Sequence, residues 1–423
     1  MIPARETAAR CSRTSPTIGP AFAMALEKPS QPFPTLRRIA HDFGVHYAAT
    51  AVVAFLFATT GPVAIILSVG ARGGLSESDI ASWIFSAFVL NSLISASFSL
   101  LYRQPLIFLW SIPGAVLLGP ALGHLAFAEA IGAFMATGVL MLLLGLSGWV
   151  RRAMQAVPMP IVMAMVAGVF LRFGIDLVFA FRDALWIAAP MSITFFALSA
   201  APRLARAVPP LIGALIIGAI AVAMLGTFRP PAGTLFALAA PNFYVPQFSW
   251  RAMIELVVPL AITVLVVQNG QGIAVLAANG HAAPINAITA ACGVGSIVTG
   301  LFGAVSTCLT GPVNAILAGS GERERQYSSA LFFCVFAAAF GLLAPFFTRL
   351  LLATPPAFIA TLAGLAMLRV LQSAFTASFA GRFSLGALVC FLVTVADVPI
   401  FNIGAPFWGL VLGLAASSLL ERE

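Results

Sequence analysis

The stretch TCLTGPVNAILAG, residues Thr307–Gly319, decides the fold of this chain. It begins with small hydroxyl residues, passes through Gly311 and Pro312, and continues as an apolar segment that contains Asn314. A similar stretch, WSIPGAVLLG, lies far upstream at Trp110–Gly119. Proline is favoured in the first turn of a helix, because its missing N–H would be unpaired there anyway. Each stretch therefore predicts a transmembrane segment that is broken halfway, with a helix beginning at the break.

The composition around these stretches is that of a membrane protein. The chain has 423 residues, of which 61% are hydrophobic and 9% are charged, whereas soluble proteins carry about 25% charged residues. Runs of about 20 apolar residues recur along the chain, as transmembrane helices require. The runs are continuous rather than alternating, so we expect an all-α polytopic protein and not a barrel. The net charge of +8 lies mostly in short loops, which fits a lipid bilayer and gives no reason to expect a nucleic-acid partner.

The apolar runs predict fourteen transmembrane segments. They are 44–69, 81–101, 105–122, 126–148, 157–180, 184–201, 208–227, 252–277, 285–302, 305–319, 328–347, 350–370, 383–399 and 405–420. The broken third and tenth segments are seven spans apart, and an odd number of spans per half gives the halves opposite orientations. The sequence therefore predicts a 7+7 inverted repeat, with residues 41–227 as the first half and 251–420 as the second. Residues 1–40 are predicted to be a disordered cytoplasmic tail.

Arginine placement predicts the orientation, with both termini in the cytoplasm. The arginines expected on the inside are Arg37, Arg38, Arg103, Arg151, Arg152, Arg203, Arg206, Arg323, Arg325 and Arg382.

The two breaks are the first candidate for a binding site. Ser111 and Thr310 stand where caps are expected. A half-helix that starts at each break has unpaired N–H groups and a partial positive charge, and two such ends that face each other would bind a carboxylate. The alternative, that both are ordinary proline kinks, stays open at this level.

Neutral amides form the second candidate. Gln268, Asn269 and Gln271 are the densest polar cluster in the apolar sequence, and Asn314 lies one helical turn beyond Thr310. The alternative is hydrogen bonding between helices. No cofactor, metal site or enzyme is expected, since neither a metal-ligand spacing nor a P-loop or nucleophile motif is present.

Ionisable residues near the apolar segments are the candidates for proton coupling, because they are costly in a membrane. Asp42 and His46, four residues apart, would share one helix face and a proton, and Asp397 is the most embedded carboxylate. Their alternative is a place at the aqueous boundary. Glu129, Asp176 and Glu255 are further candidates of the same kind.

Three motifs resemble one family. WSIPGAVLLGPAL, VVQNGQGIAVLAANG and GLFGAVSTCLTGPVNAILAG together resemble the bacterial benzoate:proton symporter (BenE) family, from about His41 to Leu420. The resemblance implies a secondary transporter of the bacterial inner membrane that imports benzoate or a related aromatic carboxylate with protons, on the architecture of the nucleobase/ascorbate and sulfate transporters. That architecture implies a core domain from spans 1–4 and 8–11 and a gate domain from spans 5–7 and 12–14. It also makes a homodimer an expected partner.

The same resemblance implies the substrate contacts. By position these are Ser111, Gly114, Gln268, Thr307, Thr310 and Gly311, and the aromatic ring is expected on Phe108, Trp110 and Phe302. Nucleobase carriers have carboxylates where this chain has Gly311-Pro312 and Gln268, and their absence favours an anionic substrate. An inorganic-anion or nucleobase carrier on the same fold, or a channel-like membrane protein, remains the alternative.

Overall fold

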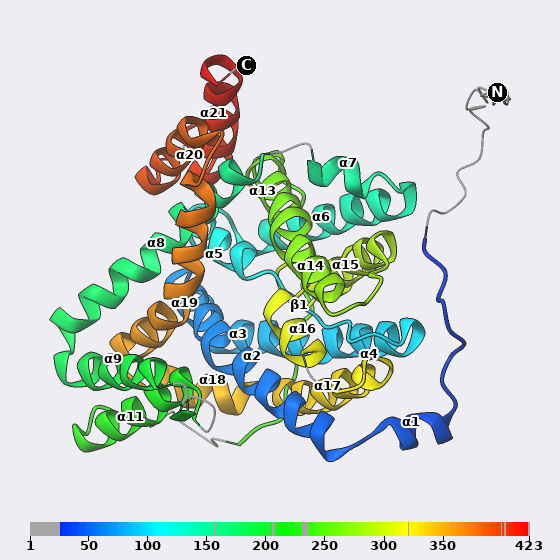
Figure 1. Cartoon of the computed structure of the whole chain (residues 1–423). Coiled ribbons are helices and arrows are strands. Elements are labelled where there is room, and N and C mark those ends of the chain that lie inside the picture. The colour runs from blue at the N-terminus through cyan, green and yellow to red at the C-terminus, as the bar shows by residue number, and fades with distance from the viewer. Residues whose placement is uncertain are drawn as a thin grey trace, which may run out of the picture.

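The computed structural model describes residues 26–155, 158–201, 203–204, 208–230, 236–319, 321–398, 400–401 and 403–421. These residues form helices joined by loops and one two-stranded sheet (Figure 1). The helices of the first half are α1 (Leu36–Asp42), α2 (Val45–Arg72), α3 (Glu77–Phe85), the π-helical η1 (Ser86–Leu90), α4 (Asn91–Tyr102), α5 (Ile112–Ala121), α6 (Phe127–Ser147), α7 (Val150–Gln155), α8 (Met159–Asp183), α9 (Leu185–Ala200) and α11 (Pro210–Met224). Those of the second half are α12 (Trp250–Ala252), η2 (Met253–Val257), α13 (Val258–Ile262), η3 (Thr263–Asn269), α14 (Gly270–Ala278), α15 (Ile285–Gly300), α16 (Gly311–Ala318), η4 (Arg323–Arg325), α17 (Gln326–Leu342), α18 (Ala344–Leu352), α19 (Pro356–Phe379), α20 (Ser384–Ala396) and α21 (Ala405–Leu420).

The sheet joins the two broken segments. Strand β1 (Phe108–Trp110) runs antiparallel to β2 (Thr307–Leu309), with Leu109 opposite Cys308. Without water in the hydrocarbon region, an extended segment must find partners for its N–H and C=O groups inside the protein. The two strands supply these partners to each other, and a helix begins directly after each strand.

Six helices in the described part of the chain are long and apolar enough to cross a membrane. They are α2, the continuous helix Glu77–Tyr102, α6, α8, the continuous helix Trp250–Ala278 and α19. A bent pair, Arg323–Leu342 and Ala344–Leu352, gives a seventh if it forms one span. The other apolar helices have 10–17 residues, fewer than the roughly 20 that a bilayer core of about 30 Å requires. The mostly helical membrane fold is confirmed, whereas the count of fourteen spans and the inverted repeat stay predictions.

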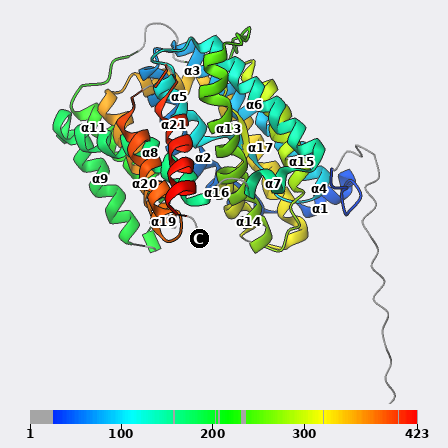
Figure 2. The same ribbon diagram turned by 90° about the horizontal axis from the view of Figure 1, so that it is seen from above.

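The helices form two groups that lie side by side (Figures 1 and 2). The strand-bearing group consists of α2 to α6 and α12 to α17, together with β1 and β2. Within it α6 packs on α15, and α17 packs on α2 and α4. The flanking group consists of α8, α9, α11, α19, α20 and α21, in which α8 packs on both α19 and α20.

Small residues allow the closest of these helix contacts, as is common in membranes. A Cβ on Gly138 of α6 would lie 2.8 Å from the carbonyl oxygen of Gly293 on α15. A Cβ on Gly293 would lie 2.5 Å from the backbone nitrogen of Leu142. The backbones of α6 and α15 therefore touch, which fixes the helix that leads into β2.

The predicted disordered tail needs a correction for its second part. Residues 1–25 lie outside the described residues, but residues 26–40 are ordered and include most of α1. The carboxylate of Glu27 accepts hydrogen bonds from the N–H groups of Asn286 and Ala287, each at 3.0 Å, in the first turn of α15. A carboxylate is favoured there by the exposed N–H groups and the helix dipole, and it anchors this part of the chain.

Candidate functional site

The two half-helices begin differently. The hydroxyl of Ser111 accepts a hydrogen bond from the N–H of Gly114 at 3.1 Å and so caps α5. The hydroxyl of Thr310, in the same place before α16, makes no such bond. The first turn of a helix leaves its N–H groups without partners inside the helix. At α5 one of these N–H groups is already bonded to Ser111, whereas α16 has no side-chain cap and its first-turn N–H groups are available as donors.

Asn314 holds the two broken segments together from the other side. Its Oδ1 accepts a hydrogen bond from the N–H of Ile107 at 2.9 Å. Its Nδ2 donates to the carbonyl oxygens of Thr310, at 2.6 Å, and of Ile107, at 3.2 Å. The fully buried side chain bonds to both the N–H and the C=O of Ile107, as the peptide group of a neighbouring strand would, just before β1 begins. Asn314 was predicted to line the substrate site, but its donors and acceptor are used in positioning the backbone.

Two further predicted contacts also position strand β2. The Oδ1 of Asn269 accepts a hydrogen bond from the N–H of Leu309 at 2.8 Å. The hydroxyl of Thr307 donates to the Oδ1 of Asn91 at 2.9 Å. Both side chains are fully buried and are not among the residues that line the cavity described below.

A cavity of about 1170 Å³ lies between the two helix groups. Its walls are mostly apolar and include Phe57 of α2, Trp110 of β1, and Phe170 and Phe195 of the flanking group. Its polar lining residues are Thr60, Ser199, Gln268, Gln271, Thr310, Arg369 and Ser373. The strand crossing and the start of α16 form one wall, and α8 and α19 form the opposite wall.

Of the predicted contacts, Thr310, Gln268 and Gln271 come together on the wall formed by the strand-bearing group. A Cβ on Gly311 would lie 2.5 Å from the Cγ of Gln271. The absence of a side chain at Gly311 therefore lets Gln271 lie directly over the start of α16. Ser111 is fully buried at the start of α5, outside the lining.

The remaining predicted contacts lie apart from the cavity. Gly114 packs against Leu260, whose Cδ2 would lie 2.9 Å from an added Cβ. Of the three aromatic residues expected under the substrate ring, only Trp110 is among the lining residues. Phe108 packs on Phe98, and Phe302 packs on Phe243.

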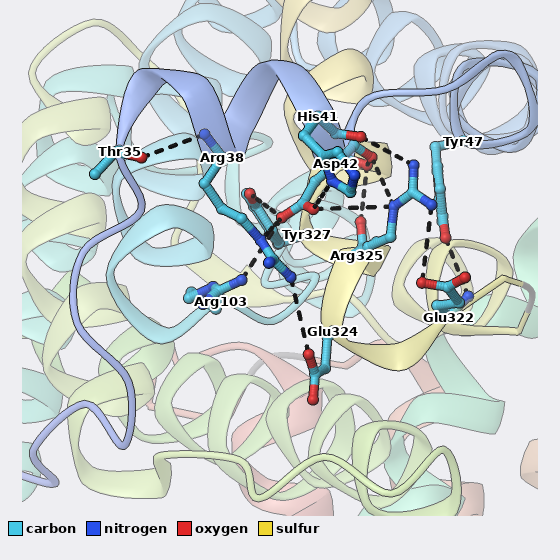
Figure 3. Close-up of polar contacts among 11 residues, drawn as sticks. Thr35, Arg38, His41, Asp42, Tyr47, Arg103, Glu322, Glu324, Arg325 and Tyr327 are labelled. Atoms are coloured by element: carbon cyan, nitrogen blue, oxygen red, sulfur yellow. Dashed lines mark hydrogen bonds and ion pairs between the residues drawn. The ribbon is translucent and has the colours of Figure 1, made fainter.

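Asp42 lies in an ion-pair cluster that joins α1 to α17 (Figure 3). Its carboxylate contacts Arg38 at 3.0 Å and Arg103 at 3.6 Å, and it accepts a hydrogen bond from the hydroxyl of Tyr327 at 2.8 Å. Burial acts to raise the pKa of Asp42, but hydrogen bonds from Tyr327, His41 and Arg38 outweigh it and lower that pKa. This environment keeps Asp42 ionised and favours a structural role.

The proposed pairing of Asp42 with His46 is corrected by the chain path. Helix α1 ends at Asp42, and α2 begins at Val45 after Phe43 and Gly44 in extended backbone. The two residues therefore do not share one helix face. His46 is exposed, and its ring packs edge-on against Tyr47.

Asp397, predicted to be the most embedded carboxylate, is exposed at the end of α20, whereas Asp42, Asp176 and Glu255 are buried. It lines a second cavity, of about 280 Å³, at the other end of the interface between the helix groups. Arg72 and Arg172 line the same cavity. Arg72 of α2 contacts Asp176 of α8 at 2.6 Å, and Arg172 contacts the same carboxylate at 3.6 Å. An ion pair therefore bridges the two helix groups at this end.

The other two carboxylates have local partners. Glu255 contacts the ring of His124 at 2.9 Å. Glu129 accepts a hydrogen bond from the N–H of Ala126 at 2.8 Å and so caps α6.

Arg369 was not singled out from the sequence. It is the one charged side chain among the residues that line the larger cavity. It stands inside the apolar run 350–370, and an arginine within a span is costly enough to mark a functional position. That cost is the signal that could have found it.

No group of three or more His, Cys, Asp or Glu side chains in the described ranges is placed to hold a metal. The described cysteines are Cys292, Cys308, Cys334 and Cys390, and all four are buried thiols.

Comparison with known proteins agrees with the architecture. Residues 42–419 match the family model BenE, benzoate membrane transport protein. The inner membrane protein YdcO of Escherichia coli K12 is 30% identical over 367 residues, which cover 85% of this chain and 92% of that protein. The benzoate membrane transport protein of Acinetobacter baylyi is 24% identical over 394 residues, which cover 92% of this chain and 98% of that protein.

Solved structures share the fold. The transmembrane domain of the cyanobacterial bicarbonate transporter BicA has a TM-score of 0.61 at 17% identity and covers 90% of this chain and 98% of that one. The murine anion transporter Slc26a9 in its inward-facing state has a TM-score of 0.59 at 14% identity, and covers 98% of this chain and 76% of that one. The family match extends over nearly the whole chain, including both strands and both half-helices. The chain therefore belongs to the BenE family of benzoate membrane transport proteins, which are membrane transporters and not enzymes.

Proposed function

We propose that this protein is a secondary transporter that imports benzoate or a related aromatic carboxylate together with protons, by alternating access. The observation that carries the proposal is the apolar cavity between the two helix groups, with the uncapped start of α16 in its wall. An aromatic ring needs apolar walls, and a carboxylate needs hydrogen-bond donors at one place in them. The name of the Acinetobacter baylyi relative agrees with this substrate class.

The carboxylate is placed at the start of α16. The N–H groups of Gly311 and Val313 lie in the first turn, where a helix binds anions. Gln268, Gln271 and Thr310 add neutral donors nearby. We therefore narrow the contacts predicted from sequence to these residues, because Ser111 already caps α5.

Alternating access fits the division into two groups. The strand-bearing group corresponds to the predicted core domain, and the flanking group to the predicted gate domain. Reciprocal contacts support the 7+7 inverted repeat: α6 packs on α15 while α17 packs on α4, and α8 packs on α20 while α19 packs on α9. In the predicted repeat each segment corresponds to the one seven places along. The contact of segment four with segment nine therefore matches the contact of segment eleven with segment two, and the contact of five with thirteen matches that of twelve with six.

The cavity reaches one face of the protein. Its lining includes Met159 at the start of α8, Ser199 near the end of α9, and Pro209 before α11. At the other end Arg72 and Asp176 join the two groups. With the predicted cytoplasmic termini, this arrangement is an inward-facing state in the bacterial inner membrane.

The proton carrier is proposed among the carboxylates that lie between the groups. Asp397, which lines a cavity with Arg72 and Arg172, and Asp176, which pairs with both arginines, are preferred to Asp42 and His46, because they lie at the boundary that must move. A homodimer stays a prediction.

An inorganic-anion carrier is the second candidate, because BicA and Slc26a9 share the fold. The aromatic and aliphatic lining favours an aromatic acid over a small hydrated anion. A nucleobase is disfavoured, because no carboxylate lines the described walls to accept its N–H groups.

Uptake into proteoliposomes tests the proposal. Labelled benzoate should accumulate when the outside is more acidic than the inside, and unlabelled benzoate should compete better than sulfate, bicarbonate or uracil. Thr310→Ala should raise the KM for benzoate about fivefold, which corresponds to one lost hydrogen bond of about 1 kcal/mol. Accumulation that ignores the pH gradient would remove proton coupling, and stronger competition by bicarbonate would favour the inorganic-anion carrier.

A further inference from the structure

Arg369 gives the larger cavity a positive charge with no counter-ion in the described structure. It is the one charged residue in the lining, and its side chain is exposed rather than packed away. Within the described ranges no carboxylate lies within ion-pair distance of it, although eleven other close ion-pair contacts are present. The other arginines of the helix interfaces, such as Arg72 and Arg103, are paired with carboxylates.

The position of Arg369 on α19 explains why it faces the cavity. The lining residues on α19 are Leu365, Ala366, Met367, Arg369, Val370, Ser373 and Ala377. Apart from Met367, their spacing places them on one face of the helix. Ala366 contacts α2, because a Cβ on Gly61 would lie 2.6 Å from the Cβ of Ala366. Arg369 lies one turn beyond that contact, where the two helices leave room for the cavity.

Arg369 and the start of α16 stand on different helix groups. Helix α19 belongs to the flanking group, whereas α16 follows the strand crossing in the strand-bearing group. An anion that enters the cavity therefore meets helix N–H groups on one wall and a guanidinium on the other. A cation in apolar surroundings is strongly destabilised unless an opposite charge accompanies it.

We propose that Arg369 is the residue that selects for anionic substrates, by pairing with the carboxylate from the flanking group as it enters or leaves the cavity. The inference rests on the proposed transport function and adds to it a second contact, on the part of the protein that moves against α16. Arginine suits this role because its planar guanidinium holds a carboxylate through two parallel hydrogen bonds. A neutral aromatic amide of the same shape gains less from it, because it has no negative charge and accepts through one oxygen only.

Ligand binding to the purified full-length chain tests the inference. Calorimetry would compare benzoate with its neutral analogue benzamide, and would include bicarbonate and sulfate, at low and high ionic strength. In Arg369→Gln, we expect about tenfold weaker binding of benzoate, a much smaller loss for benzamide, and a flatter dependence on salt. Arg369→Lys should bind benzoate more tightly than Arg369→Gln but less tightly than the wild type. Lysine keeps the positive charge but cannot form the two parallel hydrogen bonds of the guanidinium.

Arg151→Gln is the matched control. Arg151 is an exposed arginine on α7 and is not among the lining residues of the cavity, so its removal should leave all four affinities unchanged. A normal elution profile and unfolding temperature would show that Arg369→Gln is folded.

The outcomes separate the two proposals. If the wild type binds benzoate and Arg369→Gln binds it equally well, the role of Arg369 is overturned and the proposed function stands. If the wild type prefers bicarbonate or sulfate to benzoate, the aromatic substrate is overturned, and weaker binding of that anion in Arg369→Gln still supports anion selection. If Arg369→Gln weakens benzamide as much as benzoate, or if the wild type binds none of these anions, selection by charge at Arg369 is overturned.

Discussion

Replacing Asn314 with leucine tests whether the strand crossing depends on one buried amide. The change keeps a similar side-chain volume and removes the three hydrogen bonds to Ile107 and Thr310. The carbonyl of Ile107 keeps a second partner, because the N–H of Thr310 donates to it at 3.1 Å. The N–H of Ile107 then lacks the acceptor that Asn314 supplies.

The magnitude follows from that inventory. A neutral hydrogen bond contributes about 1 kcal/mol net, and an unpaired buried polar group costs about 1–3 kcal/mol. With one such group and two weakened carbonyl contacts, Asn314→Leu should reduce the free energy of unfolding by about 3 kcal/mol. Moving the leucine side chain from water into these apolar surroundings is favourable, and this offsets part of the loss.

Gln268→Leu is the matched comparison, because it makes the same kind of change on the cavity wall. Gln268 has a side chain that lines the cavity, so its replacement should leave stability nearly unchanged and weaken benzoate binding. Unfolding of both variants in detergent micelles, followed by tryptophan fluorescence against temperature and denaturant, would measure the difference. Equal stability of Asn314→Leu and Gln268→Leu would refute the reasoning that separates a positioning amide from a lining amide.

Two further predictions concern the pH dependence of stability and the ion pair between Arg72 and Asp176. Burial lowers the pKa of His281. The hydrogen bond to Gln326 raises that pKa and the charge of Arg323 lowers it further, so the pKa is lowered on balance. The unfolded chain therefore binds a proton near pH 6.5 that the folded chain does not. Stability should fall as the pH drops below about 6.5, and His281→Asn should flatten this part of the unfolding-temperature profile; parallel profiles would contradict it. Asp176→Asn should weaken the contact with Arg72 that joins the two helix groups. An impermeant maleimide should then label a cysteine placed at Gly119, which lines the smaller cavity, at a higher rate. An unchanged labelling rate would argue that this ion pair does not hold the two groups together.

Much of the fold follows from local sequence. The continuous apolar runs require helices, since a backbone in lipid must satisfy its own hydrogen bonds. The Pro-Gly and Gly-Pro breaks at Pro113 and Pro312 place two helix starts in mid-span, where proline suits the first turn. The pairing of the two breaks also follows from their related places in the chain, and the register of β1 with β2 confirms that they meet.

The division of labour among the polar residues could not be read from the sequence. Asn314, Asn269 and Thr307 resemble Gln268 and Thr310 in polarity and in their apolar setting. What separates them is which backbone groups the crossing strands leave without partners. Asn269 meets the N–H of Leu309, whereas Gln268, one residue earlier, faces the cavity.

The sequence by itself determined a helical membrane protein with two broken segments, because apolar length and proline position act locally along the chain. Only the tertiary structure decided that α16 is the uncapped helix start, that Arg369 lines the same cavity, and that Asp42 is held among arginines. These facts depend on distances between segments far apart in sequence. Hydrogen bonds and charges act over a few ångströms in space, so no spacing along the chain specifies them.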